Sequence, residues 1–155
     1  MPKRAKALLK SRTPTLLFPN KYFPDDKYSF WIDGSFKIKG SIREYIYKYV
    51  NSKMLVVVHP ERDCIYDEAF EVMYIRYERE KVVVDWCHKL RKENYPKHNG
   101  LYETNVMFRK HNTSLISETN VMWWDCIEKY SKRDQLSFNY VLWKLGVECE
   151  CFLEK

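Results

Sequence analysis

Apolar and polar residues alternate along the chain in two rhythms, one typical of strands and one typical of helices. Within residues 28–38, aromatic and β-branched residues continue up to Asp33, and Gly34 then breaks the run. Residues 54–58 form a second apolar run, which ends at His59. Both runs predict buried strands. Ligands collect at the carboxyl ends of strands in α/β sheets, so we expect a functional site beside Asp33 and His59. The alternative for His59, which precedes a proline, is a plain turn residue.

Residues 101–109 alternate with a period of two, which predicts a half-buried strand. One face would carry Tyr102, Thr104, Val106 and Phe108, and the other Glu103, Asn105, Met107 and Arg109. The second face is suited to line a polar cleft, in which Asn105 and Arg109 would bind hydroxyl and phosphate oxygens. A plain solvent-exposed face is the alternative. His111 follows in a polar turn.

Five segments show helical spacing or helix boundary signals. They are residues 2–17, with a stop at Pro14; residues 42–50, after Gly40 and Ser41; residues 67–94; residues 122–130; and a last helix through residues 136–145 that ends at Gly146. Ser131 and Asp134 stand three residues apart before this last helix, which resembles a capping box. In that interpretation Asp134 has a purely structural role.

Composition and charge narrow the class of protein. With 155 residues, 45% of them hydrophobic, the chain is long enough to form one globular domain. The formal net charge of +6 suits an anionic partner. Much of the positive excess lies near the start, at Lys3, Arg4, Lys6, Lys10 and Arg12. Such a segment favours a local anion site over a broad nucleic-acid surface, and no nucleic-acid-binding motif is recognisable.

The five cysteines are odd in number and include no Cys-x-x-Cys pair. This pattern argues against a disulfide framework and against a zinc ribbon. We therefore expect reduced thiols and a cytoplasmic protein. No apolar run has the length needed to span a bilayer, and no signal peptide is recognisable, so we expect no integral membrane segment.

Asp33 is the most informative acid of the sequence. A carboxylate without a partner at the end of an apolar strand is costly, so Asp33 should lie beside a cation, a hydrogen-bond network or open solvent. A hard divalent cation carried by a phosphate substrate would suit one carboxylate and nearby oxygen ligands such as Ser35. The alternative is that Asp33 caps an ordinary Asp-Gly turn.

Five sequence blocks together resemble the glycosyltransferase-like domain shared by the plant mucilage-related and turgor-defect proteins and by bacterial and viral sugar transferases. The blocks are Pro-Lys-Arg-Ala-Lys (2–6), Phe-Trp-Ile-Asp-Gly-Ser (30–35), His-Pro-Glu-Arg-Asp-Cys-Ile-Tyr-Asp-Glu-Ala (59–69), Gly-Leu-Tyr-Glu-Thr-Asn-Val-Met-Phe-Arg-Lys-His-Asn (100–112) and Ser-Lys-Arg-Asp-Gln-Leu-Ser-Phe (131–138). They stand in the order of that family and cover nearly the whole chain.

The resemblance implies an α/β domain of the GT-A type, a mixed sheet flanked by helices. It implies a nucleotide-sugar donor, a glycan acceptor, and Mn²⁺ or Mg²⁺ on the donor diphosphate. Asp33 matches the Asp-x-Asp-like metal motif of the family, but here Gly34 and Ser35 follow it, so the second carboxylate is missing. Asp134 matches the acid of the family's Arg-Asp-Gln block, as general base if the enzyme inverts or as a substrate-orienting acid if it retains.

The same resemblance implies the remaining site residues. Donor binding would involve Lys3, Arg4, Lys10, Asp33, Gly34 and Ser35, with the basic residues assisting the departing diphosphate. Substrate binding would involve His59, Glu103, Asn105, Arg109, His111, Arg133 and Gln135.

Family members carry a strand and a helix before the Pro-Lys-Arg block, whereas this sequence starts at the block. We therefore expect one domain over residues 1–155 that lacks the first nucleotide-binding strand. A catalytically inactive nucleotide- or carbohydrate-binding module is the main alternative to a transferase. A lipid-linked hydrolase lacks a Ser-His-Asp or zinc signature here, and a nucleic-acid-binding domain lacks a motif.

Overall fold

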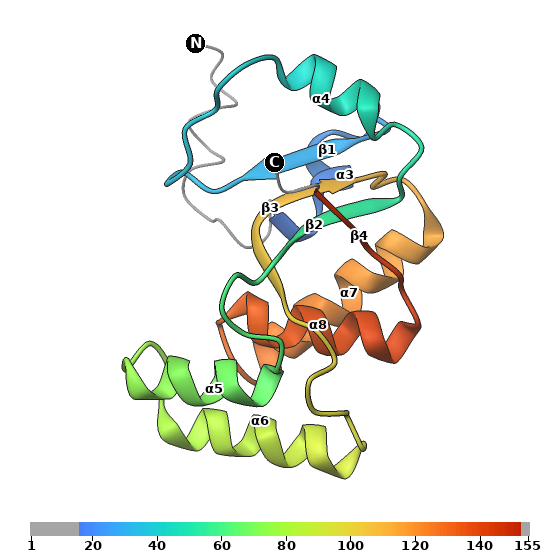
Figure 1. Cartoon of the computed structure of the whole chain (residues 1–155). Coiled ribbons are helices and arrows are strands. Elements are labelled where there is room, and N and C mark those ends of the chain that lie inside the picture. The colour runs from blue at the N-terminus through green and yellow to red at the C-terminus, as the bar shows by residue number, and fades with distance from the viewer. Residues whose placement is uncertain (1–15, 153–155) are drawn as a thin grey trace.

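The centre of the fold is strand β3, which pairs with a strand on each side. A computed structural model describes residues 16–152, with the side chain of Tyr45 left out. The strands are β1 (Ser29–Ile32), β2 (Met54–Val58), β3 (Tyr102–Arg109) and β4 (Glu150–Cys151), and the helices are α3 (Pro19–Tyr22), α4 (Ile42–Lys48), α5 (Ile65–Tyr74), α6 (Glu80–Lys92), α7 (Ser114–Lys129) and α8 (Asp134–Leu145) (Figure 1).

The four strands form one mixed sheet in the order β1-β3-β2-β4. Strands β1 and β2 are both antiparallel to β3, and β4 is parallel to β2. Because β1 and β2 run in the same direction on either side of β3, their carboxyl ends lie at the same edge of the sheet. This arrangement confirms the expected α/β fold with a mixed sheet flanked by helices.

The two faces of the sheet are covered differently (Figure 1). Helices α7 and α8 cover one face, which we call the helix-covered face, and α5 and α6 lie beyond α8. Strand residues Trp31, Val56 and Met107 belong to the core cluster on this side. On the other face, the α4 face, Leu55 and Phe108 belong to a separate small cluster. The alternation of side chains along β2 and β3 thus divides the core in two.

The predicted strands are confirmed at their positions, with one correction to burial. β2 occupies residues 54–58 as expected, and β3 begins one residue after the predicted start. β1 ends directly before Asp33. However, all four residues of β1 are only half-buried. The expectation of a buried strand is wrong there, because β1 lies at the end of the strand order and, within residues 16–152, has a neighbouring strand on one side only.

The single helical region predicted for residues 67–94 is two helices. α5 ends at Tyr74 and α6 begins at Glu80. Between them Arg76 adopts a left-handed φ of 61°, and the amide of Tyr77 donates to the carbonyl of Val72 at 2.9 Å. The alternating charges of this stretch provide no apolar stripe to continue the helix into the core.

α7 begins at Ser114, well before the predicted start at residue 122. Thr113 caps it, accepting a hydrogen bond from the amide of Ile116 at 3.4 Å. The buried side of the first turns includes Thr119 and Asn120, and these polar residues conceal the helical period from a hydrophobic pattern. α8 begins at Asp134, slightly earlier than expected, and ends as predicted at Gly146, which has a φ of 62°. Strand β4 was not predicted, because two residues carry no period.

Among residues 16–152, no helix combines the length and the apolar character that crossing a bilayer requires.

Candidate functional site

An irregularity in β3 opens the sheet at the edge where β1 and β2 end. Val56 lies opposite Met107, but the next β2 residue, Val57, lies opposite Glu103. Residues 104–106 of β3 therefore have no partner in the β2 register. Such an interruption bends the strand and redirects its side chains, and it is common beside functional sites.

Asp33 lies beside this irregularity. Ile32 pairs with Val106, and the amide of Asp33 donates to the carbonyl of Asn105 at 2.7 Å. Asp33 thus continues the β1 register opposite Asn105. Directly opposed residues of antiparallel strands project from the same face, and Trp31, two residues earlier, belongs to the core of the helix-covered face. Asp33 and Asn105 therefore lie on the face that carries α8.

The side chain of Asn105 is oriented and incompletely bonded. Its Nδ2 donates to Oε2 of Glu103 at 2.7 Å. Its Oδ1 is buried and has no hydrogen-bond partner within the chain. An unsatisfied buried acceptor costs about 1–3 kcal/mol. Asn105 Oδ1 is thus available to a ligand hydroxyl or cation next to Asp33.

The first turn of α8 is fixed against the start of β3. Oδ1 of Asn139 accepts from the amide of Tyr102 at 2.8 Å, and its Nδ2 donates to the carbonyls of Tyr102 and Gln135, both at 3.2 Å. Nε1 of the fully buried Trp123 donates to the carbonyl of Asp134 at 2.9 Å. These bonds hold Asp134 and Gln135 next to the residue that precedes Glu103. The sequence did not point to Asn139 or Trp123, because both look like ordinary helix core positions.

The capping box, the structural alternative for Asp134, does not form at this turn. Oγ of Ser131 accepts from the amide of Arg133 at 3.0 Å and donates to Oε2 of Glu78 at 2.9 Å. The carboxylate of Asp134 accepts from the amide of Gln135 at 3.0 Å. Asp134 is therefore the first residue of α8 and uses one carboxylate oxygen on the adjacent amide, which leaves the second oxygen for other partners.

Two more of the predicted site residues, Arg133 and Gln135, lie at this turn. Nε of Arg133 and Nε2 of Gln135 are buried without a hydrogen-bond partner. The guanidinium of Arg133 lies 5.3 Å from the ring centre of Tyr77, which orients it by a cation–π contact. The start of α8 thus carries two buried donors without a partner inside the described part of the chain.

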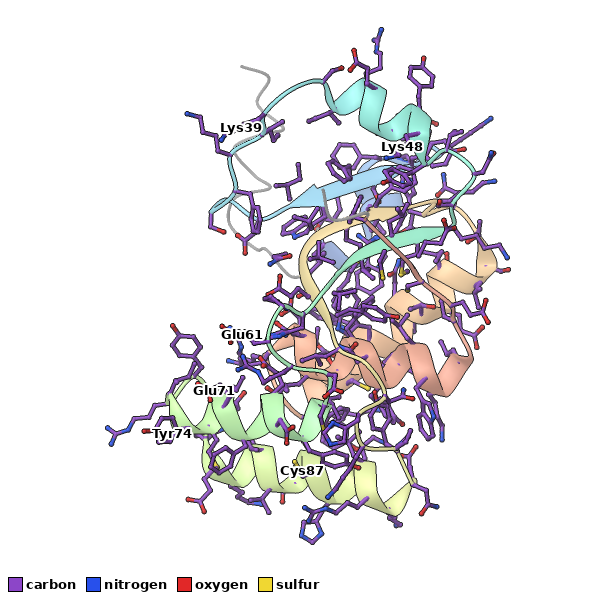
Figure 2. All side chains as sticks on the ribbon, viewed as in Figure 1. Lys39, Lys48, Glu61, Glu71, Tyr74 and Cys87 are labelled. Carbon is purple, nitrogen blue, oxygen red and sulfur yellow. The ribbon has the colours of Figure 1, made fainter. Side chains whose placement is uncertain are left out.

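His59 lies at the same edge but is engaged within its own turn. Its amide donates to the carbonyl of Leu101 at 2.8 Å. Its Nδ1 accepts from the amides of Glu61 and Arg62 at 3.2 and 3.0 Å, and its Nε2 lies 3.6 Å from Oε2 of the buried Glu68. Figure 2 shows Glu61 in this loop, between the sheet and α5. His59 thus fixes the shape of the loop.

Arg109 and His111 lie at the far end of β3. Arg109 is 1% exposed; its Nη1 donates to Oδ1 of Asn120 at 3.2 Å and its Nη2 to the carbonyl of Leu16. Burial lowers the pKa of Arg109 to about 9. Nε2 of His111 lies 3.2 Å from the carbonyl of Phe23. Both residues hold residues 16–23 against the sheet, and the structure does not bring them together with Asp33.

The predicted polar face of β3 is consequently not one cleft and not a solvent-exposed face. Met107 lies between its two ends and is fully buried in the core. Only Glu103 and Asn105 face the edge with Asp33. The twist of the sheet and the packing of α7 explain the difference, because they bury the second half of a face that alternates cleanly in sequence.

The turn after β1 carries the rest of the predicted donor residues. The amide of Phe36 donates to the carbonyl of Asp33 at 3.0 Å, which closes a turn over Gly34 and Ser35. Both of these residues are exposed. Figure 1 shows this turn and the loop after β2 on the same side of the molecule. Lys3, Arg4 and Lys10 lie outside the described residues, as does most of the basic helix predicted for residues 2–17.

A separate cluster offers three metal-ligand types. Potential ligand atoms of Cys64, Asp67 and His98 all lie within 4.8 Å of one another. Within residues 16–152 this is the one such group of three, and it does not include Asp33. The sequence did not reveal it, because His98 is remote from the other two residues along the chain.

The four-stranded mixed sheet flanked by helices is compatible with a glycosyltransferase-like α/β domain, and the comparison with known families identifies that class. Residues 8–154 match the family described as TOD1/MUCI70, glycosyltransferase-like domain. Because the match covers nearly the whole sequence, the chain belongs to this family. No curated protein and no solved structure matches the chain significantly. The resemblance seen in the sequence is thereby confirmed.

Proposed function

We propose that this protein transfers a sugar from a nucleotide-sugar donor to a hydroxyl of a glycan acceptor, as a step in polysaccharide assembly. Membership of a glycosyltransferase-like family supports the reaction class. The observation that carries the proposal is the cluster of Asp33, Asn105 and the first turn of α8 at one edge of the sheet. The amide of Asp33 donates to the carbonyl of Asn105, and Asn139 links the first turn of α8 to Tyr102 near the start of β3, which supports a site built from three elements remote in sequence.

The donor side of this site would be formed by Asp33 and Asn105. A carboxylate and an amide oxygen are ligands that Mg²⁺ and Mn²⁺ accept, and one protein carboxylate is sufficient when phosphate oxygens complete the shell. The residues therefore fit a divalent cation of the GT-A type. When bound, such a cation supplies charge stabilisation to the departing diphosphate. Ser35 offers an exposed hydroxyl in the adjacent turn, and Lys3, Arg4 and Lys10 stay predicted phosphate partners.

The acceptor side would be formed by Asp134, Gln135 and Arg133. In an inverting enzyme the free carboxylate oxygen of Asp134 takes the proton of the acceptor hydroxyl as that oxygen attacks the anomeric carbon. In a retaining enzyme it holds the hydroxyl by a hydrogen bond. Arg133 and Gln135 would donate to sugar or phosphate oxygens, which would satisfy their buried donors.

Asp134→Asn tests this assignment. The amide keeps the size of the side chain and an oxygen for the Gln135 amide but cannot accept the hydroxyl proton. We expect the transfer rate to fall by about 10²–10⁴-fold, with the unfolding midpoint and the donor affinity little changed. Asp125→Asn, at an exposed acid of α7, is the matched control. Full activity of Asp134→Asn would return Asp134 to a purely structural role.

A second candidate is an inactive module that binds a nucleotide or a sugar. The absence of a second carboxylate after Asp33 favours it, since Gly34 and Ser35 follow instead. Calorimetric titration with UDP, GDP and their sugar conjugates, with and without Mn²⁺, separates the two. Metal-dependent binding that weakens at least tenfold in Asp33→Asn supports the donor site. Binding without any turnover on a panel of glycan acceptors would favour the module.

A further inference from the structure

A second cluster of polar side chains joins the start of α5 to the connection between α6 and β3. Cys64 directly precedes α5, and Asp67 lies in the first turn of that helix. His98 lies in the connection between α6 and β3. A thiol, a carboxylate and an imidazole thus converge, with one potential ligand atom of each residue within 4.8 Å of those of the other two. None of the five cysteines forms a disulfide, so the thiol of Cys64 is chemically available.

The backbone and the ring of His98 are both held in a specific state. His98 has a φ of 50°, a left-handed conformation that costs a non-glycine residue about 1–2 kcal/mol. Its Nδ1 lies 2.8 Å from Oδ1 of Asp63. Metal-binding histidines commonly donate one ring N–H to a carboxylate, which fixes the ring and leaves the other nitrogen for the ion. Asp63 stands in that relation to His98, with Nε2 as the remaining nitrogen.

The donor types select the metal. Thiolate and imidazole together favour Zn²⁺, whereas Mg²⁺ and Mn²⁺ prefer oxygen ligands. Cys64 is 1% exposed, and Asp67 and His98 are exposed. An ion would therefore lie at the surface, with the thiolate behind it and water in the fourth position. This chemistry separates the cluster from the oxygen ligands at Asp33.

We propose that Cys64, Asp67 and His98 bind Zn²⁺, and that Asp63 is a positioning residue for His98. The ion would link the start of α5 to the segment that leads into β3. That segment contains Leu101, whose carbonyl accepts the amide of His59, and it precedes Glu103 and Asn105. The zinc would thus stabilise the loop and the strand at the edge of the proposed transferase site without contacting a substrate.

Co²⁺ titration of the full, reduced chain, stripped of metal beforehand, tests the site without any activity assay. We expect one Co²⁺ per chain with a thiolate-to-metal charge-transfer band in the near ultraviolet, and displacement of Co²⁺ by Zn²⁺. Cys64→Ser should abolish the band. His98→Gln and Asp67→Asn, at exposed positions that leave the core intact, should weaken binding by roughly a hundredfold or more, and Asp63→Asn by about tenfold with the band retained.

Two controls make the result decisive. Cys87→Ser removes a partly exposed thiol of α6, and His88→Gln removes an exposed imidazole of the same helix. Both variants should bind Co²⁺ like the parent chain. The proposal is overturned if no charge-transfer band appears, if the band persists in Cys64→Ser, or if His98→Gln and Asp67→Asn bind Co²⁺ with unchanged affinity.

Discussion

The two faces of the sheet differ in thickness and in chemistry. On the helix-covered face, Trp123, Phe138 and Met107 are at most 2% exposed, and the polar residues of the candidate site lie at the rim of this packing. On the α4 face, Phe36 and Ile38 are 49% and 52% exposed. A hollow of about 260 Å³ between the sheet and the segment before α4 is lined by residues that include Ile32, Phe36, Ile38, Val57 and Val106.

The comparison shows why the candidate site lies where it does. Unsatisfied polar atoms persist only where rigid packing holds them, since a mobile side chain would turn to water or to a neighbour. Asn105, Arg133 and Gln135 carry such atoms, and the turn that contains Gln135 is held by Trp123 and Asn139. In the described part of the chain, the α4 face is covered only by a loop and one short helix, α4. Figure 2 shows Lys39 and Lys48 at the two ends of this segment.

Trp123→Ala should give the largest effect on stability, because it removes a fully buried side chain from the core of the helix-covered face. Removing a fully buried tryptophan leaves a cavity and costs about 3–5 kcal/mol of unfolding free energy. The hydrogen bond to the carbonyl of Asp134 is lost as well. Urea unfolding followed by circular dichroism measures the cost.

Trp123→Phe separates the two roles of this residue. It keeps most of the apolar volume but removes the indole donor, so the first turn of α8 should shift. We expect a loss of about 1–2 kcal/mol together with a clear loss of transfer activity. Unchanged activity would show that the Trp123 bond does not position Asp134.

A charged network between the end of α6 and α8 should give an intermediate and pH-dependent effect on stability. Burial raises the pKa of Glu93, but bonds from Lys144, Lys89 and Tyr140 lower it to about 2. The stabilising charge of Glu93 is complete above the pKa of an unfolded Glu, about 4.3, and is lost as the pH falls through about 2.

Glu93→Gln should therefore cost about 2 kcal/mol at pH 7, and its deficit relative to the parent chain should shrink as the pH falls from about 5 to 2. Glu44→Gln, at an exposed acid of α4, is the matched control from the α4 face. Its unfolding free energy relative to the parent chain should not change over this pH range. A deficit of Glu93→Gln that stays constant over this pH range would contradict the network.

Ile38→Ser should give the smallest effect. The side chain is half-exposed over the hollow of the α4 face, so its replacement should change the unfolding free energy by less than about 0.5 kcal/mol. A loss as large as that of Trp123→Ala would show that the two faces contribute equally and that the comparison is wrong. Chemical denaturation of both variants under the same conditions decides this.

Local patterns were sufficient for the strands and for the ends of several elements. β2 and β3 were predicted from their apolar runs and alternation, and Gly146 from its role as a helix stop. α7 was predicted too short because Thr119 and Asn120 are buried polar residues. The break between α5 and α6 was missed because charged residues near Arg76 are compatible with either a solvated helix or a turn.

The sequence proposes a set of candidate site residues but not their arrangement. The resemblance pointed to Asp33 and Asp134, yet only the antiparallel register places Asp33 opposite Asn105, and only the Asn139 bonds bring α8 to β3. The same register removes Arg109 and His111 to the other end of the strand. Long-range pairing of this kind leaves no trace in the spacing of residues along one sequence.

The lack of β2 partners at residues 104–106 has a consequence for hydrogen exchange in β3. A central strand normally exchanges its amide hydrogens last, because opening it requires the whole sheet to unfold. Here the middle of β3 is bonded on the β1 side but lacks its β2 partners. Its protection against hydrogen–deuterium exchange should dip at residues 104–106, between better protected ends. A bound donor that engages Asn105 should slow exchange at residues 104–106 and remove the dip. Hydrogen exchange in β3 would then report whether the donor site is occupied.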